Sequence, residues 1–223
     1  MAAKPPSEPE PKRKERNAGE TKRRILEAAA SEFAAKGFDG ARLGTIARTA
    51  GVQQALIHHY FVDKETLHAE VVRSGLAALN EGMWTLLQGM DVPDKRLGRE
   101  DLRDLAQAFV ALLLRFFATN DTFLAILSHE ARRGNVATKL VAENVGPVFD
   151  GIVARLEAMR GRGEVRADVD ARHLVLSCVA MVAFPFQEQP FVSAIWPADW
   201  HDPKFLEERA NHIVEMILAR VLP

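Results

Sequence analysis

The stretch LGTIARTAGVQQALIHHYFV, residues 43–62, has the spacing of two short helices joined by a tight turn. Ala47 is small where two helices cross closely, and Gly51 follows four residues later, where the chain needs a left-handed conformation. The apolar positions then fall on the inward side of both helices, at Ile46, Ala50, Val52, Ile57 and Tyr60. The stretch therefore predicts a helix-turn-helix.

The outward face of the second short helix carries hydrogen-bonding side chains without formal charge. Its members are Gln53, Gln54, Ala55, Leu56, His58 and His59. Glutamine offers a donor and an acceptor together to the edge of an adenine, histidine donates to a phosphate or accepts from a base, and Ala or Leu can contact a thymine methyl group. This pattern favours base edges in a DNA major groove, because a helix exposed only to water more often carries Glu and Lys.

The segment before this stretch predicts a first helix over residues 20–36, ended by Gly37. Lys22, Arg23 and Arg24 then fall in its first turn, where the helix dipole disfavours each cation by about 0.3–1 kcal/mol. A bound phosphate removes this conflict. The alternative is that long, solvated side chains tolerate the repulsion.

Residues 20–72, from ETKRRILEAA to LHAEVV, resemble the DNA-binding domain of the TetR family of transcriptional regulators. The marks that carry the resemblance are the helix and Gly-Phe turn at 33–38, the core positions Ile46, Ala47, Ala50, Gly51 and Val52, and then Tyr60, Phe61, Lys64 and Leu67. In that family the second short helix enters the major groove. The resemblance therefore implies that the outward face described above meets the bases.

The same resemblance makes Thr45 and Lys64 phosphate contacts. Family members commonly cap the second helix with Thr or Ser near residue 42, whereas Ala41, Arg42 and Leu43 offer no hydroxyl, and Arg42 can reach a phosphate instead. The complete set of DNA-binding candidates is Arg42, Thr45, Gln53, Gln54, Ala55, Leu56, His58, His59, Tyr60, Lys64, Lys22 and Arg23.

Apolar residues recur at intervals of three and four residues along the rest of the chain, so we expect an all-α protein of about nine helices. The expected helices are 20–36, 43–50, 53–60, 64–88, 101–118, 121–133, 135–160, 170–184 and 203–222. The predicted organisation is a disordered basic tail (1–19), a three-helix DNA-binding domain (20–70) and a helical ligand-binding and dimerisation domain (71–223).

The resemblance implies that the C-terminal part forms a dimer. The last helix carries one apolar stripe, Leu206, Ala210, Ile213, Val214, Ile217 and Val221, and the helix before it is apolar on most sides. Such a pair can form half of a four-helix bundle across a two-fold axis. The alternative is that both helices complete the core of a monomer.

A ligand pocket is also implied by the resemblance, and aromatic and Met residues mark its region. The candidates are Met83, Trp84, Leu87, Phe109, Leu113, Phe116, Phe117, Phe123, His129, Phe149, Met181 and Phe184. A mostly apolar lining predicts a small hydrophobic or aromatic effector. The connection at residues 185–203 is rich in Pro, Trp and Phe, and can cover the pocket or wrap the dimer partner.

Composition excludes several other classes of protein. The net charge of -1, from 29 basic and 30 acidic residues, does not support a sequence-independent architectural DNA binder. One cysteine, Cys178, excludes an internal disulfide and fits a reducing cytoplasm. The start of the chain lacks an apolar signal core, and no apolar run reaches the roughly 18 residues that span a bilayer. We therefore expect a soluble, cytoplasmic protein.

The residues that suggest catalysis or metal binding have the wrong spacing. Ser128, His129 and Glu130 are adjacent on a helix, so their side chains point about 100° apart and cannot form a relay. His58 and His59 are likewise adjacent and lack the i, i+4 spacing of metal ligands. Cys178 lies in an apolar helix and is expected to be an inert core thiol. We expect no catalytic residue, metal or cofactor.

The sequence predicts a transcriptional repressor that releases a palindromic operator when the effector binds its C-terminal domain. An activator remains an alternative, because the sign of regulation depends on where the operator lies. A helical protein that has borrowed the DNA-binding fold for a non-regulatory role is a second alternative.

Overall fold

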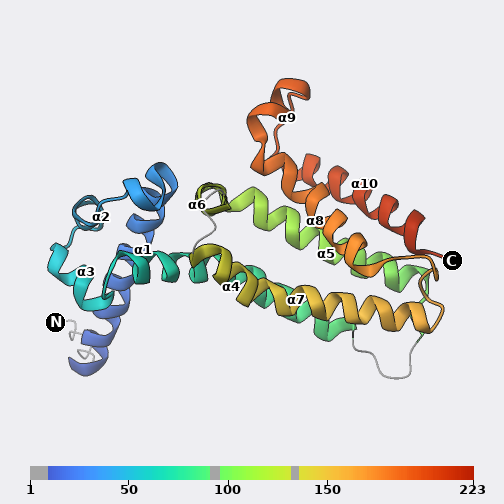
Figure 1. Cartoon of the computed structure of the whole chain (residues 1–223), viewed down its shortest axis with the longest axis horizontal. Helices are drawn as coiled ribbons and strands as arrows, with labels where there is room; N and C mark the ends of the chain where they lie inside the picture. The colour runs from blue at the N-terminus through green and yellow to red at the C-terminus, as the bar shows by residue number, and fades with distance from the viewer. Residues whose placement is uncertain (1–9, 91–95, 132–135) are drawn as a thin grey trace, which may run out of the picture. The chain divides into compact units, whose positions relative to one another are not determined.

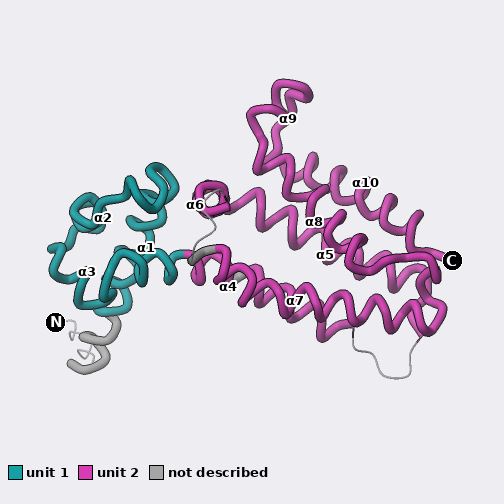
Figure 2. Tube along the Cα trace, in the orientation of Figure 1, with its two compact units in different colours: residues 1–71 teal, residues 72–223 magenta. Residues whose placement is uncertain are grey.

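The computed structural model describes residues 10–90, 96–131 and 136–223, which form ten helices and no strand. The helices are α1 (Glu10–Gly40), α2 (Leu43–Ala50), α3 (Gln54–Tyr60), α4 (Lys64–Met90), α5 (Arg99–Thr119), α6 (Asp121–Ala131), α7 (Val136–Gly161), α8 (Ala171–Gln187), α9 (Gln189–Ile195) and α10 (Pro203–Val221) (Figure 1). The all-helical fold predicted from the sequence is confirmed. The chain divides into two compact units, residues 1–71 and 72–223 (Figure 2).

The first unit is built from α1, α2, α3 and the start of α4. Its core consists of apolar side chains with no exposed surface, at Ile25, Ala29, Phe33, Ile46, Ile57 and Leu67. His68 of α4 is buried edge-on against the ring of Phe33, with the ring centroids 4.8 Å apart. Each helix therefore contributes at least one buried side chain to a single small core.

Helix α1 begins ten residues earlier than the sequence predicts. Residues 10–19 are helical, where the sequence predicts disorder, and residues 1–9 of the predicted tail lie outside the described part of the chain. The Lys, Arg and Glu residues of this segment have high helix propensity, which the compositional argument for disorder overlooks. Lys22 and Arg23 consequently lie in the interior of α1, and the expected conflict with a helix N-terminus does not arise.

The second unit packs around α5, which contacts α6, α8 and α10 (Figure 1). The buried residues of α5 are Leu102, Val110, Leu113, Leu114, Phe116, Phe117 and Ala118. Phe116 packs edge-on against Phe123 of α6, and Phe117 stacks with Phe186 of α8 at 6.1 Å. Helix α5 is thus the central buried helix that its apolar composition predicts.

The apolar stripe of the last helix lies in this core. Five of its six residues are buried, namely Ala210, Ile213, Val214, Ile217 and Val221, and α10 packs on α5 of its own chain. The stripe therefore completes the unit in the way the monomer-core alternative describes. The surface that α8 and α10 leave exposed carries different residues, among them Leu176, Phe184 and Met216.

The connection expected at residues 185–203 contains helical structure, which accounts for the tenth helix. Helix α8 continues through Pro185 to Gln187, and α9 then occupies Gln189–Ile195. Pro190 lies in the first turn of α9, where a missing backbone N–H leaves no hydrogen bond unmade. The connection that the sequence predicts between two helices is therefore partly helical itself, with Pro185 inside one helix and Pro190 at the start of another.

In the described ranges, no single helix has the length and apolar character needed to cross a membrane. The pairs α5 with α6 and α8 with α9 meet that test by length and composition only when they are joined across bends of 89° and 85°.

Glu164 fixes the turn that follows α7. Its carboxylate accepts hydrogen bonds from Arg162 Nε at 2.8 Å, from Arg162 Nη2 at 2.9 Å and from the backbone N–H of Leu97 at 3.2 Å. Only 2% of its side chain is exposed. The Arg162 guanidinium holds the pKa of Glu164 below its usual value of about 4.5.

We predict that Glu164→Ala lowers the free energy of unfolding by about 1–3 kcal/mol near neutral pH, because it leaves the Leu97 N–H unpaired. The depressed pKa means that the carboxylate stabilises the fold fully above about pH 4.5 and loses this effect as the pH falls below it. Urea unfolding of wild type and variant should therefore converge in acid. Glu143→Ala, at an exposed carboxylate, is the control, and a difference that grows as the pH falls contradicts the account.

Candidate nucleic-acid interface

The turn between α2 and α3 is made by Gly51, as the sequence predicts. Gly51 has φ 64° and ψ 40°, the left-handed conformation, directly after the last residue of α2. Its N–H donates to the Arg48 carbonyl at 3.1 Å, and the N–H of Val52 donates to the Ala47 carbonyl at 2.9 Å. These bonds satisfy carbonyls that the end of a helix otherwise leaves free, so the turn is closed by the backbone itself.

Arg24 of α1 holds the same turn from outside. Its Nε donates to the Ala50 carbonyl at 3.1 Å, and its Nη2 donates to the carbonyls of Ala50 and of Gly51, the latter at 3.1 Å. The planar guanidinium thus binds the carbonyl of the last α2 residue and that of the residue after it, and adds a positive charge at the negative end of that helix. Arg24 therefore positions the helix-turn-helix on α1, a role the sequence analysis did not assign.

Helix α3 presents the predicted outward face. Ile57 is fully buried, and its carbonyl accepts the N–H of Phe61 at 2.7 Å. The exposed side chains are Gln53, Gln54, Ala55, His58 and His59. Leu56 and Tyr60 are partly buried, and the Tyr60 ring lies 5.3 Å from His59 and 6.4 Å from Phe61. The two glutamines and two histidines are therefore accessible on one short helix whose opposite side is anchored.

Lys64 ties the start of α4 to the chain before α2. Its Nζ donates to the carbonyl of Ala41 at 3.0 Å, lies 3.5 Å from the carbonyl of Asp39, and stands 4.6 Å from the centre of the Phe38 ring. An ammonium group has three donors and a full charge, so these contacts leave it able to attract a phosphate. The structure thus gives Lys64 a structural role beside the phosphate contact that the resemblance implies.

The other predicted phosphate contacts fall into two groups. Arg42 is the N-cap residue of α2 with an exposed side chain, and Thr45 is partly buried in the first turn of that helix. In contrast, Lys22 pairs with Glu70 at 3.0 Å, and Arg23 pairs with two carboxylates of α1, those of Glu20 and Glu27. Arg42 and Thr45 therefore lie within the helix-turn-helix, whereas Lys22 and Arg23 are engaged in ion pairs.

Arg48 is a basic residue of the motif that the sequence analysis missed. A Cβ atom built on Gly44 would lie 3.4 Å from Oε1 of Gln54, so Gly44 lies beside the outward side of α3. Arg48 is exposed and one helical turn further along, hence on the same side of α2. Residues 41–62 contain two arginines, two histidines and no carboxylate. The i, i+4 spacing from Gly44 is the signal that identifies Arg48.

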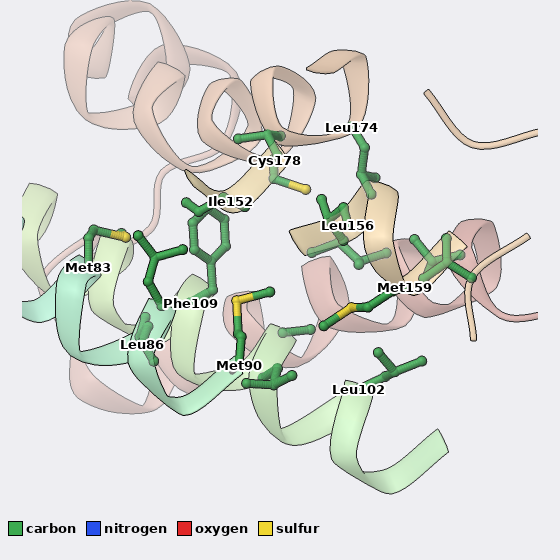
Figure 3. Close-up of a pocket in the computed structure, with 17 residues that line it drawn as sticks. Met83, Leu86, Met90, Leu102, Phe109, Ile152, Leu156, Met159, Leu174 and Cys178 are labelled. Atoms are coloured by element: carbon green, nitrogen blue, oxygen red, sulfur yellow. The ribbon is translucent and has the colours of Figure 1, made fainter. Parts of the chain in front are cut away.

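The second unit contains an apolar cavity of about 100 Å³ between α4, α5, α7, α8 and α10. It is lined by Met83, Leu86, Leu87, Met90, Leu102, Leu105, Ala106, Phe109, Ile152, Leu156, Met159, Val165, Leu174, Val175, Cys178, Ile217 and Val221. The side chains in Figure 3 consist of carbon and sulfur alone, and those of Met90, Phe109 and Cys178 point inward from three different helices. The cavity therefore offers contact to apolar groups and no charged partner.

The predicted pocket residues are scattered around this cavity, and of the twelve only Met83, Leu87 and Phe109 line it. Leu113, Phe116 and Phe117 are buried elsewhere in the core, Trp84, His129 and Phe184 are exposed, Phe149 packs beside Val153, and Met181 lines a separate groove. Helix α5 is apolar nearly all round, so its composition does not reveal which side faces a cavity.

Cys178 is the one reactive group in the cavity wall, and its environment suppresses its reactivity. The thiol is buried and free, and burial raises its pKa to about 11. A thiol with this pKa is protonated near neutral pH and is a poor nucleophile. Within the described residues, no group of three or more His, Cys, Asp or Glu side chains is arranged to hold a metal ion.

A helix-turn-helix with an exposed, uncharged recognition face, joined to a helical unit with an apolar cavity, defines a DNA-binding regulator. The family model "Bacterial regulatory proteins, tetR family" matches residues 25–71, and the model "Tetracyclin repressor-like, C-terminal domain" matches residues 100–217. The chain belongs to the TetR family of transcriptional regulators, whose members bind operator DNA and typically dimerise. These proteins are regulators and not enzymes.

Known relatives agree over most of the chain. The transcriptional repressor NicS of Pseudomonas putida is 26% identical over 208 residues, which cover 90% of this chain and 92% of the relative. The transcriptional repressor SCO4008 of Streptomyces coelicolor is 32% identical over 162 residues, or 72% and 76% of the two chains. The crystal structure of the TetR-family regulator PfmR from Thermus thermophilus matches with a TM-score of 0.66 and a sequence identity of 21%. The match covers 90% of this chain and 96% of PfmR.

We predict that Gly51→Ala destabilises the first unit by about 1–2 kcal/mol, since a residue with a Cβ is strained at φ 64°. The added Cβ would also lie 3.0 Å from Nη2 of Arg24 and disturb that clamp. Gly19→Ala, in the open interior of α1, is the matched control and should be neutral or stabilising. Thermal unfolding followed by circular dichroism measures both, and equal effects of the two variants contradict the role of Gly51.

Proposed function

We propose that the protein is a repressor that binds a palindromic operator as a homodimer and releases it when a small apolar effector enters the cavity of its second unit. The observation that carries the proposal is the exposed face of α3, with Gln53, Gln54, His58 and His59. These residues belong to a helix-turn-helix, residues 41–62, that contains no carboxylate. Both relatives described above are named repressors, which supports this sign of regulation. The proposal includes a cytoplasmic location, where operator DNA is found.

The contacts with DNA divide by chemistry. Gln54 and His58 are assigned to base edges, supported by Gln53, Ala55, Leu56 and His59, because they share the exposed face of α3. Arg42, Arg48, Thr45 and Lys64 are assigned to phosphates, because charge and hydroxyl groups position a protein without reading sequence. Lys22 and Arg23 are assigned to the ion pairs that hold α1, and not to DNA.

The effector is a neutral, apolar molecule. The cavity wall has no charged or hydrogen-bonding side chain except the thiol of Cys178, so a carboxylate or ammonium placed there loses its hydration without compensation. A ring or short hydrocarbon instead gains by leaving water, about 25 cal/mol for each Å² of apolar surface buried. The size of the cavity, about 100 Å³, favours a small ligand.

Helix α4 is the proposed carrier of the response. It runs from Lys64, which holds the chain before α2, to Met90, which lines the cavity together with Met83 and Leu87. A ligand that displaces the cavity end of α4 therefore acts on the same helix that contributes Leu67 and His68 to the DNA-binding core. By linkage, operator DNA must weaken effector binding by the same factor as the effector weakens DNA binding.

The dimer is proposed to form through the outer face of α8 and α10. Leu176, Phe184 and Met216 are large apolar side chains about half exposed or more on these helices. A groove of about 380 Å³ runs between them and is lined partly by Leu174, Met181 and Ile217. A two-fold homodimer carries two recognition helices, and operators offer such dimers two half-sites about 34 Å apart, one turn of DNA.

We predict that the double variant Gln54→Ala, His58→Ala lowers the preference for operator over scrambled DNA by about 10- to 100-fold for each good base contact removed. Lys64→Ala should weaken binding to both duplexes alike and lower the midpoint of thermal unfolding, because it also frees the Ala41 carbonyl. Lys36→Ala, an exposed lysine of the same unit, is the control. Equal loss of discrimination in the double variant and in Lys64→Ala contradicts this division of contacts.

We predict that toluene raises the midpoint of thermal unfolding by a few degrees, while benzoate, which carries a charge in place of the methyl group, does not. Ala106→Phe fills the cavity wall and should abolish the response, whereas Ala108→Phe, exposed on the same helix, should preserve it. Stabilisation by benzoate equal to that by toluene, or an unchanged response in Ala106→Phe, contradicts an apolar effector site in this cavity.

A further inference from the structure

The segment between α8 and α10, residues 188–202, forms an arm. Its C-terminal half packs on the core through Trp200, and its N-terminal half, which contains α9, is exposed to solvent. Trp200 is buried with 2% exposure, and its ring lies 6.2 Å from Phe186 of α8 and 4.8 Å from Phe205 of α10. Helix α9, in the other half of the arm, has no buried residue and extends beyond the neighbouring helices of this unit (Figure 1). The arm is therefore held in place by aromatic packing while its helix lacks a partner.

The bare half of the arm is strongly apolar. Phe191 is 71% exposed and Ile195 is 86% exposed, and the two are four residues apart, hence on one side of α9. Trp196, half exposed, follows directly. A helix of seven residues is too short to be stable in water by itself, and apolar groups gathered on one side of it mark a surface that another surface covers.

We infer that the arm of one protomer packs on a second copy of this chain and extends the dimer contact made by α8 and α10. The inference rests on the dimer proposed above. Leu176, Ala180 and Phe184 are all exposed and follow at intervals of four along α8, so the apolar surface runs without interruption from the proposed dimer face to the base of the arm. An interface that begins on α8 therefore reaches α9.

The charge of the arm argues against other partners. Residues 188–202 contain Glu188, Asp199 and Asp202 and no Lys or Arg. DNA and anionic lipid both attract basic segments and repel acidic ones. The charge of the arm therefore favours a protein surface over DNA or an anionic lipid.

The test combines sedimentation with hydrogen exchange on the full-length protein. By two-fold symmetry each lost contact occurs twice, so Phe191→Ser, Ile195→Ser should raise the dimer dissociation constant by about 100-fold. Trp84→Ser, which removes an exposed aromatic side chain of α4, is the matched control and should leave that constant unchanged. In wild type, amides of residues 189–196 should exchange slowly as a dimer and quickly after dilution to the monomer.

Each other outcome is decisive. A wild-type dimer whose 189–196 amides exchange quickly, and which the double variant matches in affinity, overturns the arm contact and leaves dimerisation through α8 and α10 standing. Slow exchange that persists in samples that sediment as a monomer shows that the arm is covered by its own chain and also overturns the inference. A wild type that stays monomeric overturns the proposed dimer itself, and the arm contact with it.

Discussion

The hydrogen bonds from the guanidinium of Arg24 to the carbonyls of Ala50 and Gly51 are the constraint on which the recognition surface depends. They fix the end of α2 against α1 at the point where Gly51 turns the chain through a left-handed conformation. Helix α3 has only seven residues and one fully buried side chain, Ile57, so it takes its direction from that turn. Reading of base edges requires such a fixed direction, because a hydrogen bond fails when its donor is misplaced by an ångström.

A second constraint is the continuity of α4. Its first turns supply Leu67 and His68 to the core of the DNA-binding unit, and its last turns supply Met83, Leu87 and Met90 to the cavity wall. A cavity lined by carbon and sulfur responds to shape and burial and not to charge, so the proposed effector acts by filling space. In this account, a change of packing at one end of a helix becomes a change of position at the other.

The sequence predicts the helix-turn-helix well because its signals are local. The spacing of Ala47 and Gly51 predicts the turn. The apolar positions Ile46 and Ile57 predict the inner faces of the two helices, and the glutamines predict the outer face of α3. The hydrogen bonds of Arg24 are different, because they join its side chain to a carbonyl 26 residues away in the chain. Such a long-range contact gives no recognisable pattern in the sequence. The position of the cavity could not be predicted either, because α5 is apolar on most sides and only Met83, Leu87 and Phe109 of the predicted residues line it. The apolar stripe on α10, which the sequence predicts to contact a dimer partner, is buried in the core of its own chain.

The most direct test of the account is binding of the full-length protein to DNA from upstream of its own coding sequence. Fluorescence anisotropy with a scrambled duplex as competitor, repeated across salt concentrations, separates base recognition from phosphate attraction. The account predicts saturable binding by two subunits per site and a preference of at least about 1,000-fold for the upstream duplex. Equal affinity for both duplexes at every salt concentration contradicts the claim that the face of α3 reads sequence at this site.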